Sequence, residues 1–230
     1  MSVEARVIPW SHSSLGAFET CGFRYLQERV LRVIPKKTFA EAQEGIDKHK
    51  AIEDYLKSVA DLQDTKLKSL VDSTLGHLDY RHLKFEHKLA VTKDRAPCSY
   101  DRAESPEVYH RGIIDVMYAD PEDPVAHLFD WKNGKVNEHS DQLKANAICV
   151  MAHHPHVQRV DTNYVWMKHN HVTKGRVYRD FSAEIWTRFC ARVDRMEQKA
   201  KEGVWTKNPS GLCKKHCPVT SCEFNGQRES

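Results

Sequence analysis

The chain has 230 residues, of which 40% are hydrophobic and 9% aromatic, and this ordinary globular composition excludes global disorder. Its 35 Lys and Arg nearly balance its 32 Asp and Glu, so the formal net charge of +3 permits a nucleic-acid partner but does not require one. No apolar run of about 18 residues is present and the N-terminus lacks a signal-peptide pattern, so we expect no membrane span and a cytoplasmic location.

Two helices are expected first along the chain. One should begin near Ser13 or Ser14, which are good N-cap residues, and its helical spacing directs the thiol of Cys21 inward. The next should cover residues 41–60 and carry a buried stripe on one face. This stripe consists of His49, Ile52, Leu56 and Val59.

A third, more polar helix over residues 66–83 leads into a part of the chain where apolar and polar residues alternate with the period of a strand. Because side chains alternate along a strand, Leu128, Asp130 and Lys132 should emerge from the same face of the sheet. The strands are expected at 84–91, 108–118 and 126–132.

The remaining pattern predicts a helix over residues 139–154 and a long helix over 182–201, with two strands between them. We expect these strands at 157–167 and 176–181, joined by a turn around 171–175. Helices before and after a mixed sheet place the chain in the α/β class. One domain is expected over 1–230, made of a helical part (1–83), a core (84–181) and a C-terminal helix with a cysteine-rich tail (182–230).

Five polar side chains should converge at this sheet. Asp115, Asp130 and Lys132 come from two strands, while His49 comes from a helix and Glu86 from the first strand. Two carboxylates with water and a phosphate can complete the oxygen shell that Mg²⁺ prefers, and an imidazole leans the site toward Mn²⁺. A fixed ammonium group would stabilise charge on the phosphate. Together, a cation and a lysine favour phosphodiester hydrolysis.

Three of the seven cysteines crowd into the tail segment LCKKHCPVTSC, as Cys213, Cys217 and Cys222. In a reducing compartment, such a cluster is more often a metal site than a disulfide framework. The tail shows little regular pattern, so we expect something other than a hydrophobic core to hold it.

These motifs resemble the PD-(D/E)xK nuclease superfamily. GIID followed by FDWK is similar to the D…(D/E)xK signature, and EGIDKHKAIEDYL, FEHKLAV and QLKANA resemble the G-x-x-x-H helix, the first core strand and the Q-x-x-x-Y helix of its RecB-like branch. SHSSLGAFETCGFRYL is similar to the start of AddB and of the CRISPR-associated adaptation nucleases. The resemblance implies a restriction-endonuclease-like mixed central sheet flanked by helices, with N-terminal helices and a cysteine-rich C-terminal tail.

The resemblance also implies a role for each matched residue. The implied metal ligands are His49, Asp115, Asp130 and the carbonyl group of Trp131. The implied catalytic residues are Lys132, Asp130, Asp115, Gln142 and Glu86. Gln142 would contact the substrate or the surroundings of the lysine. Asn146 departs from the pattern because it replaces the tyrosine of Q-x-x-x-Y.

In the same relatives, one early cysteine and three C-terminal cysteines hold a [4Fe–4S] cluster. The residues Cys21, Cys213, Cys217 and Cys222 would reproduce that set. The spacing here is C-x3-C-x4-C instead of the usual C-x2-C-x5-C, and His216 stands where the middle cysteine would fall. Zn²⁺ bound by cysteine and histidine is therefore the alternative.

The function implied is that of a metal-dependent DNA exonuclease, using Mg²⁺ or Mn²⁺ on single-stranded or end-exposed DNA in recombination, repair or phage DNA processing. A phage-encoded enzyme would act in the host cytoplasm. Exonuclease action is implied by the resemblance alone. An endonuclease on the same fold and a non-catalytic DNA-binding protein with a structural metal cluster are the alternatives. Digestion polarity, DNA against RNA preference, protein partners and oligomeric state are not indicated.

Overall fold

The computed structural model describes residues 7–34, 40–137 and 141–227. The chain divides into two compact units. The sheet unit comprises residues 38–187, and the terminal unit comprises residues 1–37 and 188–230. The prediction of one domain, with parts at 1–83, 84–181 and 182–230, stays a prediction.

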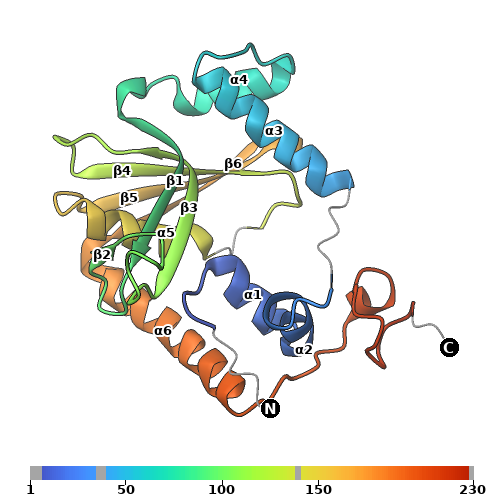
Figure 1. Cartoon of the computed structure of the whole chain (residues 1–230). Coiled ribbons are helices and arrows are strands. Elements are labelled where there is room, and N and C mark those ends of the chain that lie inside the picture. The colour runs from blue at the N-terminus through green and yellow to red at the C-terminus, as the bar shows by residue number, and fades with distance from the viewer. Residues whose placement is uncertain (1–6, 35–39, 138–140, 228–230) are drawn as a thin grey trace. The chain divides into compact units, whose positions relative to one another are not determined.

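The sheet unit contains a six-stranded sheet with the order β2-β1-β3-β4-β5-β6 (Figure 1). Strands β4 and β5 are parallel, and the other neighbours are antiparallel. Helices lie on both faces, so the predicted mixed sheet flanked by helices, a restriction-endonuclease-like α/β fold, is confirmed. The strands are β1 (Leu83–Val91), β2 (Pro97–Cys98), β3 (His110–Tyr118), β4 (Val125–Lys132), β5 (Arg159–Trp166) and β6 (His171–Tyr178).

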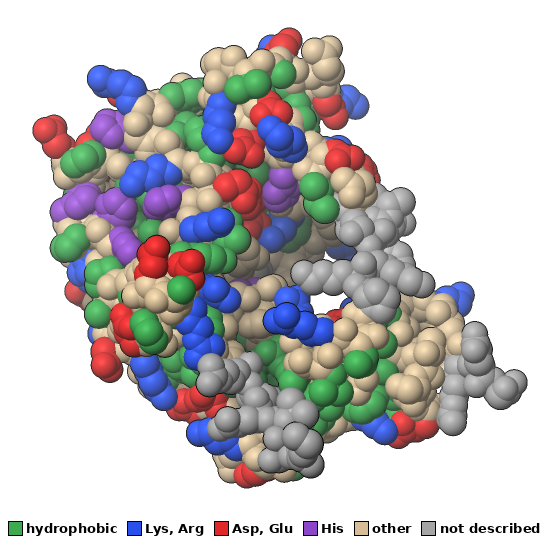
Figure 2. Space-filling view, viewed as in Figure 1, with side chains coloured by type: hydrophobic (Ala, Val, Ile, Leu, Met, Phe, Trp, Pro, Cys, Tyr) green, Lys and Arg blue, Asp and Glu red, His purple; other side chains and the backbone are tan. Residues whose placement is uncertain are grey.

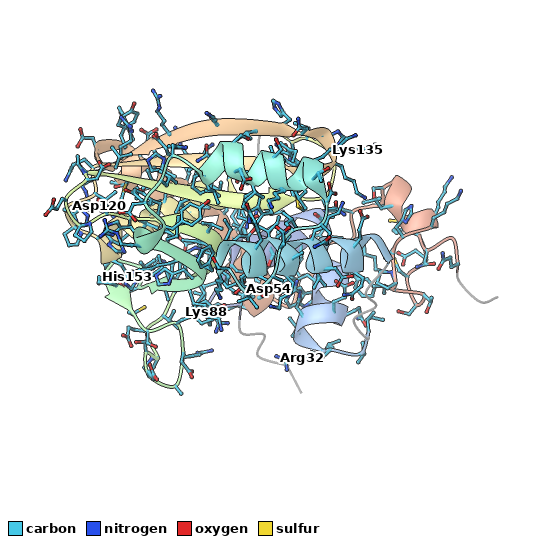
Figure 3. The ribbon with its side chains drawn as sticks, turned by 90° about the horizontal axis from the view of Figure 1, so that it is seen from above. Arg32, Asp54, Lys88, Asp120, Lys135 and His153 are labelled. Carbon is cyan, nitrogen blue, oxygen red and sulfur yellow. The ribbon has the colours of Figure 1, made fainter. Side chains whose placement is uncertain are left out.

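Three helices cover the sheet: α3 (Ala40–Leu56), α4 (Thr65–Leu75) and α5 (Gln142–His153). Helix α4 begins at the N-cap Asp64, whose carboxylate accepts hydrogen bonds from the next turn. Its apolar stripe and that of α3 pack on one face, against residues such as Phe129 and Trp131. Figure 3 shows α3 and α4 side by side, with Asp54 of α3 labelled. This packing places α3 beside the end of β4 and the middle of β3.

Helix α5 is buried on nearly every side, from Leu143 to Met151, which suits a helix pressed against a sheet face. Its N-terminal turn is tied to β5, because the backbone N–H of Leu143 donates to the Tyr164 hydroxyl at 2.9 Å. At the other end, Arg179 donates to the carbonyl groups of Met151 and His154. The first residue of α5, Gln142, is therefore fixed at the sheet face that carries Asp130.

The terminal unit contains α1 (His12–Thr20), α2 (Gly22–Tyr25), the π-helix η1 (Leu26–Val30) and the part of α6 (Arg179–Lys201) from residue 188 onward. Helix α1 starts after Ser11, which forms a capping box with Ser14, so it begins slightly earlier than expected. Arg192 of α6 pairs with Glu19 at 2.7 Å, and the ring of Tyr25 stacks on Trp205. These contacts hold the start of the tail, which sequence periodicity could not place.

Some sequence expectations were wrong at element ends. Helix α3 ends at Leu56, so Val59 lies in a turn and is 71% exposed instead of buried. The third helix stops at Leu75 and not at residue 83, because Gly76 caps it and a 3-10 turn over Tyr80–His82 follows. The expected turn at 171–175 is part of β6, and the chain turns earlier, at Asn170 in the left-handed region.

A close backbone approach joins α5 to β3. A Cβ atom added at Gly112 would lie 2.2 Å from the Asn146 Oδ1 atom, and the Asn146 amide donates to the Ile113 carbonyl at 3.3 Å. Asn146 is only 3% exposed, so this side chain is committed to packing. It occupies the helical position where the family pattern has tyrosine.

The Gly112→Ala variant should therefore unfold more easily than the wild type, by about 1–3 kcal/mol, because the added methyl group must displace Asn146. Chemical denaturation followed by circular dichroism measures this loss. Gly134→Ala is the matched control, since no atom lies within 4 Å of a Cβ atom added there. Equal stability of the two variants would contradict the packing described.

Among the described residues, no helix is both long and apolar enough to cross a membrane.

Candidate active site

Strand register brings three carboxylates into one row across β1, β3 and β4. The β1–β3 pairs on either side place Glu86 opposite Asp115. The β3–β4 ladder ends where Val116 pairs with Phe129, so Asp115 and Asp130 are the next residues of the two strands. Because side chains alternate along each strand, Asp115 and Asp130 share one face. They meet where β3 and β4 separate.

The gap between β3 and β4 is bridged by side chains. The backbone N–H of Trp131 donates to Asp115 Oδ2 at 2.8 Å, in place of a ladder bond. His49 of α3 lies with its Nε2 atom 2.8 Å from the Trp131 carbonyl oxygen and its Nδ1 atom 3.5 Å from Asp115 Oδ2. Because a carbonyl oxygen only accepts, Nε2 carries a proton and donates. In a neutral imidazole, Nδ1 then presents a lone pair toward the carboxylate.

Two acceptors that face each other are suited to binding a cation between them. The ligand atoms of His49, Glu86 and Asp115 all lie within 4.8 Å of one another. One imidazole nitrogen and two carboxylates form a donor set that fits Mn²⁺ or Mg²⁺, with remaining positions open to water or substrate oxygen. The donor set therefore fits the divalent cation expected from the sequence.

Glu86 has a backbone φ of 46°, in the left-handed region that a residue with a large side chain rarely adopts. The neighbouring residues, Phe85 and His87, keep their pairing with β3, so the distortion is local. Strain of this kind in the middle of a strand concentrates at functional sites. It redirects the carboxylate toward His49 and Asp115.

Asp130 lies in a second, connected group. Its Oδ2 atom is 2.6 Å from Lys132 Nζ, and its Oδ1 atom accepts from Gln142 Nε2 at 2.8 Å. Lys132 also donates to Gln142 Oε1, at 3.0 Å. Gln142 thus binds both groups, because its amide nitrogen donates to the acid and its amide oxygen accepts from the ammonium group. Lys132 stays about one third exposed and can still reach a substrate.

Burial governs the titration of these acids. It raises the pKa of Asp115 to about 8, with a further contribution from the negative charge of Asp130. Burial also raises the pKa of Asp130, although Lys132 opposes this. The pKa of Glu86 is raised by burial and by the charge of Glu53. A bound cation would relieve these unfavourable negative charges, which is what the arrangement of donors favours.

All seven sequence-predicted site residues come together in the sheet unit: His49, Glu86, Asp115, Asp130, Trp131, Lys132 and Gln142. The grouping within the set differs from the expectation, because Glu86 joins His49 and Asp115, whereas Asp130 is engaged by Lys132. Sequence reasoning missed Tyr164, which is paired with Asp130 in the β4–β5 register. Its ring lies 6.0 Å from Lys132 Nζ, and its hydroxyl group holds the start of α5. The sequence feature that could have indicated Tyr164 is its place in β5, the strand that lies parallel to β4 with its Asp130 and Lys132.

The four cysteines of the predicted cluster meet in the terminal unit. Cys21, Cys213, Cys217 and Cys222 line one small cavity, and none of them is in a disulfide. Lys207 lines the same cavity and pairs with Glu223 at 2.7 Å. The backbone N–H of Ser210 donates to Cys213 Sγ at 3.4 Å. His216 is exposed and is not among the lining residues.

Histidines also gather elsewhere in the sheet unit, as the purple side chains on the left of Figure 2 show. The rings of His154 and His156 lie 5.9 Å apart, and His153 contacts the Ala90 carbonyl oxygen at 2.8 Å. Figure 3 places His153 at the same end of the unit as Asp120. Burial lowers the pKa of His154 to about 4, with help from Lys84. The His154 imidazole is therefore neutral near pH 7.

A comparison with protein families matches residues 9–222 to the model described as PD-(D/E)XK nuclease superfamily. A search of curated proteins found no match to the sequence.

Proposed function

The chain belongs to the PD-(D/E)XK nuclease superfamily, and from this premise we propose that it is a metal-dependent DNA exonuclease of the RecB-like branch, acting on single-stranded or end-exposed DNA. The observation that carries the proposal is the donor group of His49, Glu86 and Asp115 beside the Asp130–Lys132 pair. Cleavage of nucleic acid with the help of a divalent cation is what this superfamily and this donor set support together.

Mg²⁺ or Mn²⁺ would be held by His49, Glu86 and Asp115, with Asp130 and the Trp131 carbonyl as the further ligands that the family pattern implies. When bound, such a cation supplies Lewis acidity toward the phosphate and makes water a better nucleophile. The Trp131 carbonyl oxygen now accepts from His49, and the Trp131 N–H donates to Asp115. This one residue therefore orients the imidazole and the carboxylate together.

Lys132 provides the fixed positive charge. Its ammonium group would stabilise the negative charge that develops on the phosphate during attack, in a partly buried position where electrostatic interactions are strengthened. Asp130 and Gln142 restrict its position through hydrogen bonds. Gln142 is a positioning residue in this account, since its amide contacts the lysine and the acid.

Exonuclease action and the choice of DNA rest on the family resemblance. Digestion of end-labelled linear and closed circular single-stranded DNA with Mn²⁺ tests them. An exonuclease should degrade the linear molecule and leave the circle intact. Cleavage of the circle at a similar rate would establish the alternative, an endonuclease on the same fold. Binding of both without any cleavage would establish the second alternative, a non-catalytic DNA-binding protein.

We further propose a [4Fe–4S] cluster on Cys21, Cys213, Cys217 and Cys222. The support is that these four side chains, from opposite ends of the chain, line one cavity without forming disulfides. Zn²⁺ is the alternative, but its proposed ligand His216 lies on the exposed side of the tail, outside that lining. A cluster would tie the coreless tail to α1 and α2.

The freshly purified protein should be brown, with broad absorbance near about 400 nm and four iron atoms per chain, as expected for this cluster type. Cys213→Ala should remove the colour and the iron. Cys98→Ala, a change of a half-buried cysteine in the sheet unit, is the control and should keep both. A colourless protein with stoichiometric zinc would reject the iron–sulfur proposal.

A further inference from the structure

A cavity of about 420 Å³ lies on the face of the sheet opposite the Asp130 side chain. His127 and Phe129 of β4 line it, and strand alternation turns them away from the face that carries Asp130. Lys174 and Arg176 of the edge strand β6 form one side, and His77, which follows α4, forms another. Four separate segments of the sheet unit thus close around one space, with a volume typical of small-ligand sites.

The side chains around this cavity carry an excess of positive charge. Lys174 and Arg176 are exposed at its rim, and His77 and His127 add two imidazoles. The one carboxylate in the lining, Asp161, is already 2.9 Å from the Arg159 guanidinium group and 3.8 Å from that of Arg176. Arg159, which does not line the cavity, therefore compensates most of the Asp161 charge, and an anion in the cavity would meet mainly cationic and imidazole groups.

The floor of the cavity differs from its rim. Phe129 is 2% exposed, and the half-buried His127 ring stacks on it with an interplanar angle of 14°. Asn163, only 7% exposed, lies beside them and donates to the Leu128 carbonyl oxygen. Aromatic groups below and cations above match a molecule with one flat, weakly polar part and one anionic part.

We propose that this cavity binds a small nucleotide, with its phosphate group held by Lys174 and Arg176 and its base against His127 and Phe129. Enclosure by side chains from β4, β5, β6 and the end of α4 favours a single nucleotide over a continuous strand. The proposal does not depend on the nuclease activity, because none of these residues belongs to the site at the separation of β3 and β4. Phe129 adjoins Asp130 in β4, so a ligand in this cavity lies on the face of β4 opposite the Asp130 and Lys132 side chains.

Isothermal titration calorimetry of the full chain in EDTA, which prevents cation-dependent nucleotide binding at the other site, tests the proposal. The probes are deoxyadenosine monophosphate, deoxyadenosine and inorganic phosphate. The monophosphate should bind most tightly. If inorganic phosphate binds as tightly as the monophosphate, the cavity is a site for free phosphate. If deoxyadenosine binds as tightly, the phosphate group makes no contact that contributes to binding. Either result overturns the proposal.

Variants then locate the binding. The double variant Lys174→Ala with Arg176→Ala should weaken monophosphate binding by about tenfold or more, because charged hydrogen bonds to the phosphate are lost. Asp161→Asn should instead tighten it several-fold, since the one carboxylate of the lining is removed. Lys66→Ala, which removes one positive charge from α4 outside the cavity, should have no effect. Unchanged affinity in both the double variant and Asp161→Asn would overturn the proposal, and the opposite signs expected for these two separate a binding effect from general destabilisation.

Discussion

Lys132→Ala should lower the rate of DNA cleavage by about a thousandfold, because a preorganised charge beside the reacting phosphate is removed. The Lys132 ammonium group lies 2.6 Å from Asp130 and 3.0 Å from Gln142, so its position is restricted before substrate arrives. Binding of DNA should change far less than the rate, since the lysine acts on charge that develops in the transition state. Single-turnover cleavage, with binding measured separately in Ca²⁺, resolves the two quantities.

Lys135→Ala is the matched control for that experiment. Lys135 is an exposed lysine three residues further along the chain, labelled in Figure 3, and its removal should leave the rate within about twofold because exposed charges interact weakly. Loss of Lys132 leaves Asp130 buried without its ammonium partner, and the raised pKa of Asp130 lets the acid take up a proton instead of unfolding the protein. Circular dichroism should therefore show a folded variant. Full activity of Lys132→Ala would remove the lysine from the mechanism.

Asp115→Asn should abolish cation-dependent cleavage and, in the absence of cations, stabilise the protein. The folded-state pKa of Asp115 is raised to about 8, whereas an unfolded Asp titrates near about 3.9. The folded protein therefore holds a proton that the unfolded chain releases. The stability that this proton contributes is complete below pH 4 and is lost as the pH rises toward 8.

Thermal unfolding of the metal-free protein between pH 4 and pH 8 measures this effect. The wild type should lose on the order of 5 kcal/mol across the interval, and Asp115→Asn should lose less, so that the variant melts about 10 °C higher at pH 8. Added Mn²⁺ should raise the melting temperature of the wild type much more than that of the variant. Asp94→Asn, a change of an exposed acid, is the control. Identical pH profiles for wild type and Asp115→Asn would refute the burial argument.

The sequence indicated the members of the site because its signals are local. Alternation along residues 126–132 placed Asp130 and Lys132 on one face, and helical spacing put His49 on an inward stripe. The grouping of Glu86 with His49 and Asp115 was not available in the same way. It depends on the β1–β3 register and on a backbone φ of 46° at Glu86. The spacing of apolar and polar residues predicts neither of these.

The sequence predicted a turn over residues 171–175, which belong to strand β6 in the structure. It is an edge strand in which five of the eight residues are polar or glycine, from His171 to Arg176 apart from Val172, so no apolar alternation marks it. The polar run and Gly175 suggested a turn. The turn in the structure depends on Asn170, which adopts the left-handed conformation. Asparagine adopts this conformation less readily than glycine does, so it predicts a turn less strongly.

The meeting of four cysteines from the two ends of the chain could be expected only from the family resemblance. Spacing within the tail says nothing about Cys21, which is 192 positions before Cys213 by residue number. In the structure, the Asn208 amide of the tail donates to the carbonyl groups of Glu19 and Thr20 at the end of α1. This contact places the tail beside Cys21 at the shared cavity. Long-range placement of this kind requires tertiary structure.

Cation-dependent cleavage is the most direct test of the central claim, that a divalent cation at His49, Glu86 and Asp115 acts with Lys132 on a phosphodiester. The measurement is the digestion of an end-labelled linear single-stranded DNA by the purified protein over a titration of Mn²⁺ and Mg²⁺, with EDTA as the blank. We predict cleavage that saturates with the cation and is absent in EDTA. DNA that stays intact at every cation concentration, with a folded protein, would contradict the account.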